Sequence, residues 1–209
     1  MDGADQHIAA VFFDFGGVIS LLDQEKMSRL ERRYGLPEGG FPQAMYDIPE
    51  WRALEVGKGS EEAWLEAAGR KLDELAGRPI PDIREEWSRI SLRLDAAVVD
   101  LAERLRQRYR VGLISNAALD LEDILRDHLK IDHLFEVVVN SARVGVAKPD
   151  KRIFHVAAER VGVEPAACLH IDDLWPNVHG AREAGFQAIH YDGDFSSLER
   201  KIRSLGMAW

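Results

Sequence analysis

Four groups of polar residues that suit metal or phosphoryl chemistry lie far apart along this chain of 209 residues. They are Asp14 in FFDFGGVI, Ser115 and Asn116 in GLISN, Lys148 in AKPD, and Asp172 and Asp173 in HIDD. Two carboxylates can hold a hard cation such as Mg²⁺, a lysine and a hydroxyl can hold phosphate oxygens, and a carboxylate can attack phosphorus. Singly, each group is as typical of a turn, a helix cap or a solvated loop, so the chemistry depends on their coming together.

The elements predicted around these groups would bring them to one place. Apolar runs rich in β-formers predict buried strands, and helical stripes separate them in the second half of the chain. The predicted strands are IAAVFFDF, VGLIS, FEVVVN, CLHID and QAIHY, and one predicted helix carries Leu121, Ile124, Leu125 and Leu129. This alternation predicts an α/β fold, a doubly wound parallel sheet of the Rossmann-like kind. Ligands of such sheets bind at the carboxyl ends of the strands, which is where the polar groups occur.

The stretch between the first two predicted strands departs from this alternation and predicts a helical insertion. Its helices would begin at Asp or Ser caps and end at Gly. The predicted caps and stops are Asp23 and Gly35, Ser60 and Gly77, and Asp82. No part of the insertion has the pattern of a strand, and we expect Trp51, Trp64 and Trp87 to fill its interior. The predicted domains are an α/β core at residues 1–19 and 92–209 and a helical domain at residues 20–91.

Composition narrows the class of protein. The chain carries 27 Lys and Arg against 36 Asp and Glu, a net charge of −9, which argues against binding a nucleic acid backbone but allows a small anionic substrate. No apolar stretch approaches the ~20 residues of a membrane span. The acidic start MDGADQH lacks the basic region of a signal peptide, so we expect a cytoplasmic protein without membrane contact. Cys168 is the single cysteine, and we expect it in the core.

Taken in order, the motifs resemble those of the haloacid dehalogenase-like hydrolase superfamily over essentially the whole chain. The matching stretches are FFDFGGVI, GLISN, AKPDKRIF and HIDDLWPNVHGAREAG. The helical insertion resembles the α-helical first-type cap of this family. Its segment ALEVGKGSEEAWLEAAGRKL is similar to the cap of the subgroup with DD in the last motif, which includes sugar-phosphate phosphatases and the phosphatase domain of soluble epoxide hydrolase. The resemblance implies a Mg²⁺-dependent phosphatase acting on a small phosphorylated metabolite through an aspartyl-phosphate.

The resemblance also implies a role for each residue of the motifs. Asp14 would be the nucleophile and a Mg²⁺ ligand, together with Asp173 and the backbone carbonyl of Gly16. The groups that would hold the phosphoryl group are Ser115, Asn116, Lys148 and the backbone N–H groups of Phe15 and Gly16. Lys148 would also restrain Asp14. Asp172 and Asn177 would act behind these residues or through water, and Lys151 would face solvent.

Gly16 is the position at which this chain departs from the family. The usual phosphatase has a second Asp here, whose side chain protonates the leaving group and then activates water. Gly keeps the backbone carbonyl and N–H but lacks that acid, and proton transfer of this kind is typically worth ~10²–10⁴-fold in rate. We therefore expect a slower phosphatase, or one suited to esters with a good leaving group such as an anomeric sugar phosphate. Asp23 could supply the acid, although its expected role is to cap a helix.

Two other functions remain open on the sequence. A 2-haloacid dehalogenase of the same superfamily also uses an Asp nucleophile without the second Asp, but it needs no Mg²⁺, so the pair Asp172–Asp173 would have no role. A ligand-binding protein with weak or no turnover is the alternative outside enzymology, and Gly16 keeps it open. Lys58 in the cap could contact substrate or be solvated, and Trp175 could line the entrance or pack beneath its loop. The sequence allows either a monomer or a homodimer.

Overall fold

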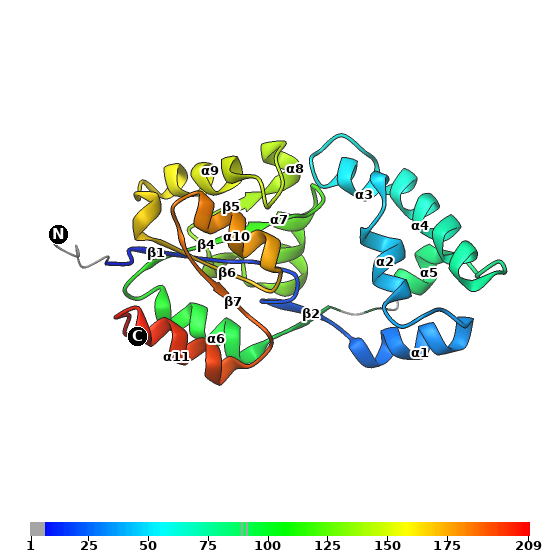
Figure 1. The fold of residues 1–209 in the computed structure, drawn as a ribbon, viewed down its shortest axis with the longest axis horizontal. Helices are drawn as coiled ribbons and strands as arrows, with labels where there is room; N and C mark the ends of the chain where they lie inside the picture. The colour runs from blue at the N-terminus through cyan, green and yellow to red at the C-terminus, as the bar shows by residue number, and fades with distance from the viewer. Residues whose placement is uncertain (1–6, 89, 91) are drawn as a thin grey trace.

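The computed structural model describes residues 7–88, 90 and 92–209, and in these residues five parallel strands form a sheet in the order β5-β4-β1-β6-β7 (Figure 1). The strands are β1 (Ala10–Phe13), β4 (Arg110–Ser115), β5 (Val137–Asn140), β6 (Cys168–Asp172) and β7 (Gln187–His190). Each lies within or overlaps one of the predicted apolar runs. The parallel sheet with helices on both faces confirms the predicted α/β class.

The side chains of β1 alternate between the two faces of the sheet, as the pleat of a strand requires. Val11 and Phe13 pack with α6 and α11 on one face, whereas Ala10 and Phe12 pack with α9 and α10 on the other, and Figure 1 shows the two pairs of helices on opposite sides. The helices are α6 (Ala96–Leu105), α9 (Lys151–Val161), α10 (Trp175–Glu183) and α11 (Phe195–Ser204). Covering both faces explains why the strands are apolar without alternation.

The connections within the core include one departure from prediction. The shorter elements are α7 (Leu121–Asp123), the π-helix η1 (Ile124–Leu129), the 3₁₀ turns η2 (Asp132–Leu134) and η3 (Pro165–Ala167), and α8 (Ser141–Val144). The predicted single α-helix over Leu121 and Leu129 is therefore wrong in its second half, which is wider and ends at Lys130 with φ 58°. Its apolar residues still reach the core, since Leu125 is fully buried. The apolar spacing does not distinguish the two helix types.

The helical lobe, defined as α1 to α5, lies beyond the carboxyl ends of the strands (Figure 1). Its helices are α1 (Gln24–Tyr34), α2 (Gly40–Tyr46), α3 (Pro49–Leu54), α4 (Glu61–Ala76) and α5 (Ile83–Ser88). Two predicted pairs of helix ends are confirmed: Asp23 and Gly35 cap α1, and Ser60 and Gly77 cap α4. Helices α2 and α3 were not predicted, because six or seven residues are too few to show a helical period.

Two short strands join the helical lobe to the core, and the first of them contradicts the prediction that residues 20–91 contain no strand. They are β2 (Ser20–Leu22) and β3 (Leu92–Leu94), which pair antiparallel. The partners lie at the two ends of the insertion, so a local sequence pattern does not reveal the pairing. The predicted domain boundaries stay a prediction, and residues 1–6, 89 and 91, which the predicted domains include, lie outside the described residues.

The helical lobe has its own apolar cluster, separate from the two that flank the sheet. Trp51, Trp64 and Trp87 lie in it with Tyr46, as predicted for the tryptophans, at ring-centroid distances of 5.1–6.5 Å. The indole N–H of Trp64 donates to the Met45 carbonyl at 2.6 Å, so its polar atom is satisfied inside the cluster. No helix among the described residues is long and apolar enough to cross a membrane. Cys168 is buried in the core, as predicted.

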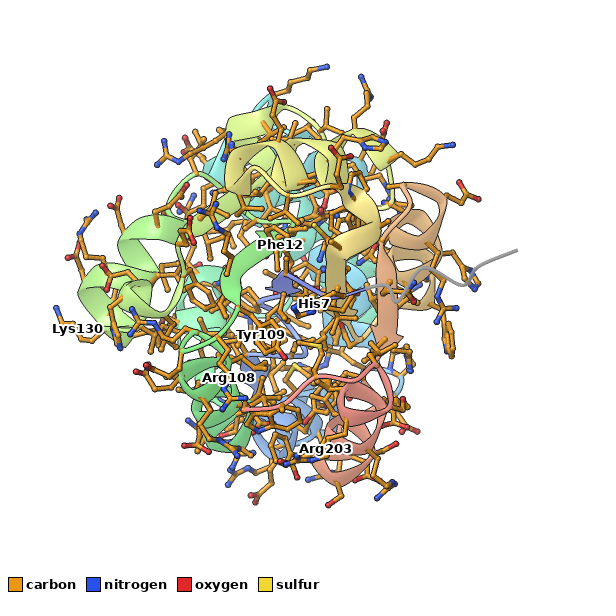
Figure 2. All side chains as sticks on the ribbon, turned by 90° about the vertical axis from the view of Figure 1, so that its left-hand side faces the viewer. His7, Phe12, Arg108, Tyr109, Lys130 and Arg203 are labelled. Carbon is orange, nitrogen blue, oxygen red and sulfur yellow. The ribbon has the colours of Figure 1, made fainter. Side chains whose placement is uncertain are left out.

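Gly112 in β4 tests how tightly the sheet is packed around Phe12, which Figure 2 places at the centre of the molecule. A Cβ at Gly112 would lie 2.7 Å from the Phe12 ring and 3.0 Å from Val137. We expect Gly112→Ala to lower the free energy of unfolding by about 1–3 kcal/mol and Gly112→Val to lower it further, as overpacking does. Urea denaturation measures both. Equal urea midpoints for the wild type and the two variants would show that Gly112 is not tightly packed against Phe12.

Candidate active site

The predicted polar residues meet at the carboxyl edge of the sheet. Asp14 follows β1 and is fixed there by its N–H, which donates to the Ile171 carbonyl of β6 at 2.8 Å. Ser115 ends β4 and Asp172 ends β6, on either side of β1. Lys148 arrives from the loop between α8 and α9. These four residues are buried, with exposed fractions of 0–7%. The strand order and the loop before α9 together bring distant residues into one enclosed cluster.

Lys148 is the centre of this cluster. Its ammonium nitrogen Nζ lies 2.9 Å from Asp14 Oδ1 and 2.6 Å from Asp172 Oδ2, and it donates to the Ile114 carbonyl at 2.9 Å. An ammonium has three N–H donors, so all of them have protein acceptors here. Lys148 therefore restrains Asp14, as the resemblance implied, and it would have to share a donor with any phosphoryl oxygen.

Asp172 pairs with Lys148 and is itself held by several hydrogen bonds. Its oxygens accept hydrogen bonds from Asn177 Nδ2 at 3.0 Å and from the Leu174 N–H at 2.9 Å, and Oδ2 lies 2.9 Å from His170 Nε2. Burial opposes ionisation of Asp172, but Lys148 and His170 outweigh it and hold the pKa of this carboxyl well below its usual range. His170 is a fully buried residue of β6, and its contact with Asp172 adds it to the site.

Asn116 fixes the loop that carries Lys148. Its Oδ1 accepts from the Lys148 N–H at 2.8 Å, and its Nδ2 donates to the Lys148 carbonyl at 3.0 Å. These two hydrogen bonds clamp the backbone on which the ammonium depends. The carboxyl of Glu55, which comes from the helical lobe, also interacts with the side chain of Asn116. Glu55 was not among the predicted site residues, because the segment EVGKG has no pattern that singles out its carboxyl.

The two glycines after Asp14 serve different purposes. Gly17 has φ 78°, and a Cβ there would overlap the carboxyl of Asp173, so this position requires glycine for its conformation and for space. Gly16 has no such constraint, since no described atom outside residues 15–17 lies within 4 Å of the place of its Cβ. The position at which the family usually carries an acid is therefore open and sterically able to hold one.

Three carboxylates of the cluster suit a divalent cation. Oxygens of Asp14, Asp172 and Asp173 lie within 4.8 Å of one another. One lysine against three carboxylates leaves two negative charges, which one divalent cation would neutralise. The pKa values of two of these carboxyls reflect the excess of negative charge. Burial, with the charge of Asp172, raises the pKa of Asp173 to about 6. Burial and Asp172 also raise the pKa of Asp14, although the charge of Lys148 opposes this. The residues present therefore fit Mg²⁺, a cation that prefers oxygen ligands.

The structure leaves several other candidates outside the cluster. Asp23 accepts from the Lys26 N–H at 3.0 Å and caps α1, as expected. Lys151 is solvent-facing, with 55% of its side chain exposed, and Lys58 is exposed as well. Trp175 is half exposed and stacks on His190 with ring centroids 4.4 Å apart. The candidate site residues therefore lie at the strand ends, in the loop that carries Lys148, at Asn177 in α10 and at Glu55.

Comparison with known proteins identifies the class of protein. The sequence profile of the haloacid dehalogenase-like hydrolases matches residues 8–185. The chain belongs to the haloacid dehalogenase-like hydrolase family, which confirms the resemblance read from the four motifs and the prediction of a hydrolase.

Two curated relatives and one solved structure illustrate this membership. The chain is 28% identical to phosphatase MT3486 of Mycobacterium tuberculosis, over 95% of this chain and 94% of that protein. It is also 28% identical to fructose-1-phosphate phosphatase YqaB of Escherichia coli, over 88% of this chain and 96% of that protein. Its fold is similar to that of a family enzyme from Bacteroides thetaiotaomicron in complex with magnesium and inorganic phosphate, with a TM-score of 0.68 and 24% identity over 91% and 98% of the chains.

Replacing Lys148 by Met tests the electrostatics of the cluster. Asp14 and Asp172 would then face each other, buried and without a cation, so we expect a loss of about 3–5 kcal/mol in the free energy of unfolding near pH 8. The folded-state pKa values of both carboxyls would rise above their unfolded values. The folded protein would then hold protons that the unfolded chain releases, so the deficit should shrink as the pH falls towards 4.

The measurement is urea denaturation of Lys148→Met between pH 4 and pH 8, with and without added MgCl₂. Lys151→Met is the matched control, because that lysine is exposed and lies in the same segment. A deficit for Lys148→Met that is the same at every pH would show that lost packing, and not uncompensated charge, causes it.

Proposed function

We propose that the protein is a Mg²⁺-dependent phosphatase that hydrolyses the phosphate monoester of a small metabolite through an aspartyl-phosphate on Asp14. The observation that carries this proposal is the buried cluster in which Lys148 holds Asp14 beside Asp172 and Asp173. A carboxylate with one oxygen fixed and a cation site next to it is suited to attack a phosphoryl group. The curated relatives, which are phosphatases, support the same reaction class.

Asp14 is oriented for attack by the contacts of one oxygen. Oδ1 accepts from the Phe15 N–H at 2.6 Å and lies 2.9 Å from Lys148 Nζ, whereas no described residue donates to Oδ2. Oδ2 would form the bond to phosphorus while the bond from phosphorus to the ester oxygen breaks, releasing the alcohol. Water would then attack the phosphorus of the aspartyl-phosphate, freeing inorganic phosphate and the carboxylate.

The metal ligands in this proposal are Asp14, Asp173 and the backbone carbonyl of Gly16. A Mg²⁺ ion bound there would offset the repulsion between an anionic nucleophile and an anionic substrate. Gly17 keeps Asp173 close to the turn because its lack of a side chain leaves room for that carboxyl. Asp172 and Asn177 are not metal ligands in this proposal. Asp172 pairs with Lys148, and Asn177 donates a hydrogen bond to Asp172.

The phosphoryl group would be held by Ser115 and Asn116, by Lys148 and by the N–H groups of Phe15 and Gly16. The proposed cap is residues 20–91, which would cover the carboxyl edge and select the substrate. The net charge of −9 favours a small phosphorylated substrate over nucleic acid.

The dehalogenase alternative depends on a different residue than the sequence suggested. Asp172 pairs with Lys148 whether or not a cation binds, so it does not separate the two reactions. Asp173 does, because its carboxyl lies beside Gly17, it is only half-buried, and the described ion pairs of Lys148 go to Asp14 and Asp172 instead. We therefore rest the phosphatase proposal on Asp173 and Asp14 together.

Removal of the nucleophile or the metal should abolish turnover. We expect Asp14→Asn to lose at least about 10³-fold in kcat on p-nitrophenyl phosphate, and EDTA to silence the wild type until excess Mg²⁺ is added. Asp150→Asn is a control, because this aspartate caps α9. Release of chloride from 2-chloropropionate in the presence of EDTA, without phosphatase activity, would instead identify a dehalogenase.

Binding of the metal should weaken as the pH falls. The pKa of Asp173 is raised to about 6 by burial and by Asp172, so below that pH a proton competes with the cation for this carboxyl. We expect the Mg²⁺ affinity, measured by calorimetry, to be roughly tenfold lower near pH 5 than near pH 7.5. Asp173→Asn should weaken Mg²⁺ binding at both pH values. It should also remove the part of the pH dependence of the affinity that the titration of Asp173 causes.

A further inference from the structure

Hydrolysis of an unactivated ester needs a proton donor for the departing oxygen, and the carboxyls of the cluster are committed elsewhere. Asp14 attacks, and Asp172 accepts from Lys148, Asn177 and a backbone N–H. Asp173 lies over Gly17, where the proposed cation would hold it as a carboxylate. Gly16 has no side chain to offer. A donor would therefore have to come from outside these strand ends.

Glu55, the residue that ends α3, meets this requirement by position. The carboxyl ends of the strands face the helical lobe (Figure 1), and Glu55 is 8% exposed. Its backbone N–H donates to the Trp51 carbonyl at 2.8 Å, which completes the last turn of α3. Its side chain interacts with the Asn116 amide and with Trp51. Asn116 is one of the residues proposed to hold the phosphoryl group, and the charge of Lys148 also acts on Glu55, so the Glu55 carboxyl lies on the side of the site where that group would bind.

The segment after Glu55 is packed closely against the core. Gly57 has φ 72°, and a Cβ there would overlap the carbonyl oxygen of Ala142 in α8. Ala118, in the loop that follows Asn116, packs against the apolar cluster of the helical lobe. These contacts hold the segment that carries Glu55 against the core. The carboxyl thus comes from the lobe, opposite the sheet edge from which Asp14 attacks, which is where the leaving group of an in-line displacement lies.

The charges around Glu55 allow it to carry a proton. Burial raises its pKa, against the opposing effects of Arg52, Asn116, Trp51 and Lys148. Arg52 is the largest of these opposing effects, although its guanidinium is largely exposed and also pairs with Asp47 at 3.0 Å. A carboxyl with a raised pKa is more often protonated near neutral pH, which is what a general acid needs.

We propose that Glu55 is the general acid and base of this enzyme, taking over from the helical lobe the task for which position 16 has no side chain. This inference rests on the proposed phosphatase function. In the first step Asp14 Oδ2 bonds to phosphorus, the bond to the ester oxygen breaks, and its electron pair takes the proton of Glu55 to give the alcohol. In the second step the Glu55 carboxylate takes a proton from a water molecule while the oxygen of that water bonds to phosphorus. The bond between phosphorus and Asp14 Oδ2 breaks at the same time. Glu55 ends protonated and Asp14 ionised, as both began.

The test compares two substrates of nearly equal shape. Phenyl phosphate needs a proton for its leaving oxygen, whereas p-nitrophenyl phosphate releases a stable phenolate without one. We expect the wild type to hydrolyse both, and Glu55→Gln to lose about 10²–10⁴-fold in kcat/KM on phenyl phosphate but less than about threefold on p-nitrophenyl phosphate. Because kcat/KM reports the steps up to phosphoryl transfer to Asp14, the second step does not blur the comparison.

Position 16 supplies the rescue. No described atom outside residues 15–17 lies within 4 Å of the place of a Cβ at Gly16, so the substitution Gly16→Asp begins in open space. We expect Gly16→Asp to raise kcat/KM of Glu55→Gln on phenyl phosphate at least about tenfold and to change the wild type little. Glu31→Gln is the matched control, because Glu31 is also 8% exposed in the helical lobe, where it accepts from the Phe41 N–H. It should affect the two substrates equally.

Three outcomes would overturn the assignment of Glu55. They are an equal loss on both substrates in Glu55→Gln, a wild type already selective for p-nitrophenyl phosphate, and a gain of tenfold or more from Gly16→Asp in the wild type. The last comparison needs no Glu55 variant, so it holds even if Glu55→Gln fails to fold. Absence of Mg²⁺-dependent hydrolysis of p-nitrophenyl phosphate by the wild type would reject the phosphatase function itself, and with it this role.

Discussion

A single buried ammonium organises this molecule. Lys148 carries its charge into the interior at the end of a parallel sheet, where an unpaired cation would cost several kcal/mol, and two carboxylates and a carbonyl receive its three N–H groups. Each carboxylate comes from a different strand end. The interaction therefore ties β1 and β6 to the loop between α8 and α9, and it fixes one oxygen of Asp14 while leaving the other exposed to a ligand.

Strand order makes this interaction available. Because β1 lies between β4 and β6, its end is flanked by the ends of both neighbours, and three separated parts of the chain meet without a long loop. The excess of carboxylates over cations in the cluster follows from the same arrangement. A protein that buries this excess has a ready binding site for a divalent cation, since the cation removes repulsion that folding has already created.

The core and its polar strand ends could be predicted because their signals are local. IAAVFFDF is apolar because both sheet faces are covered, and Asp14 interrupts it at the place where the strand ends. The features that were missed depend on contacts between distant residues or on geometry that spacing does not encode. The pairing of Ser20 with Leu94 joins the two ends of the insertion, η1 differs from an α-helix by its width, and Glu55 gains its significance from Asn116, which lies far away in the sequence.

The close approach of Gly57 to Ala142 couples chemistry to the position of the lobe. If the proton donor travels with the lobe, each opening that admits substrate or releases product also withdraws the group that activates water. A phosphorylated Asp14 beneath an open lobe would then persist. The lifetime of this covalent intermediate would depend on how often the lobe closes. Such an enzyme would pass its phosphoryl group to whichever acceptor is enclosed at closure, water or an alcohol, so enclosure would govern the choice between hydrolysis and transfer.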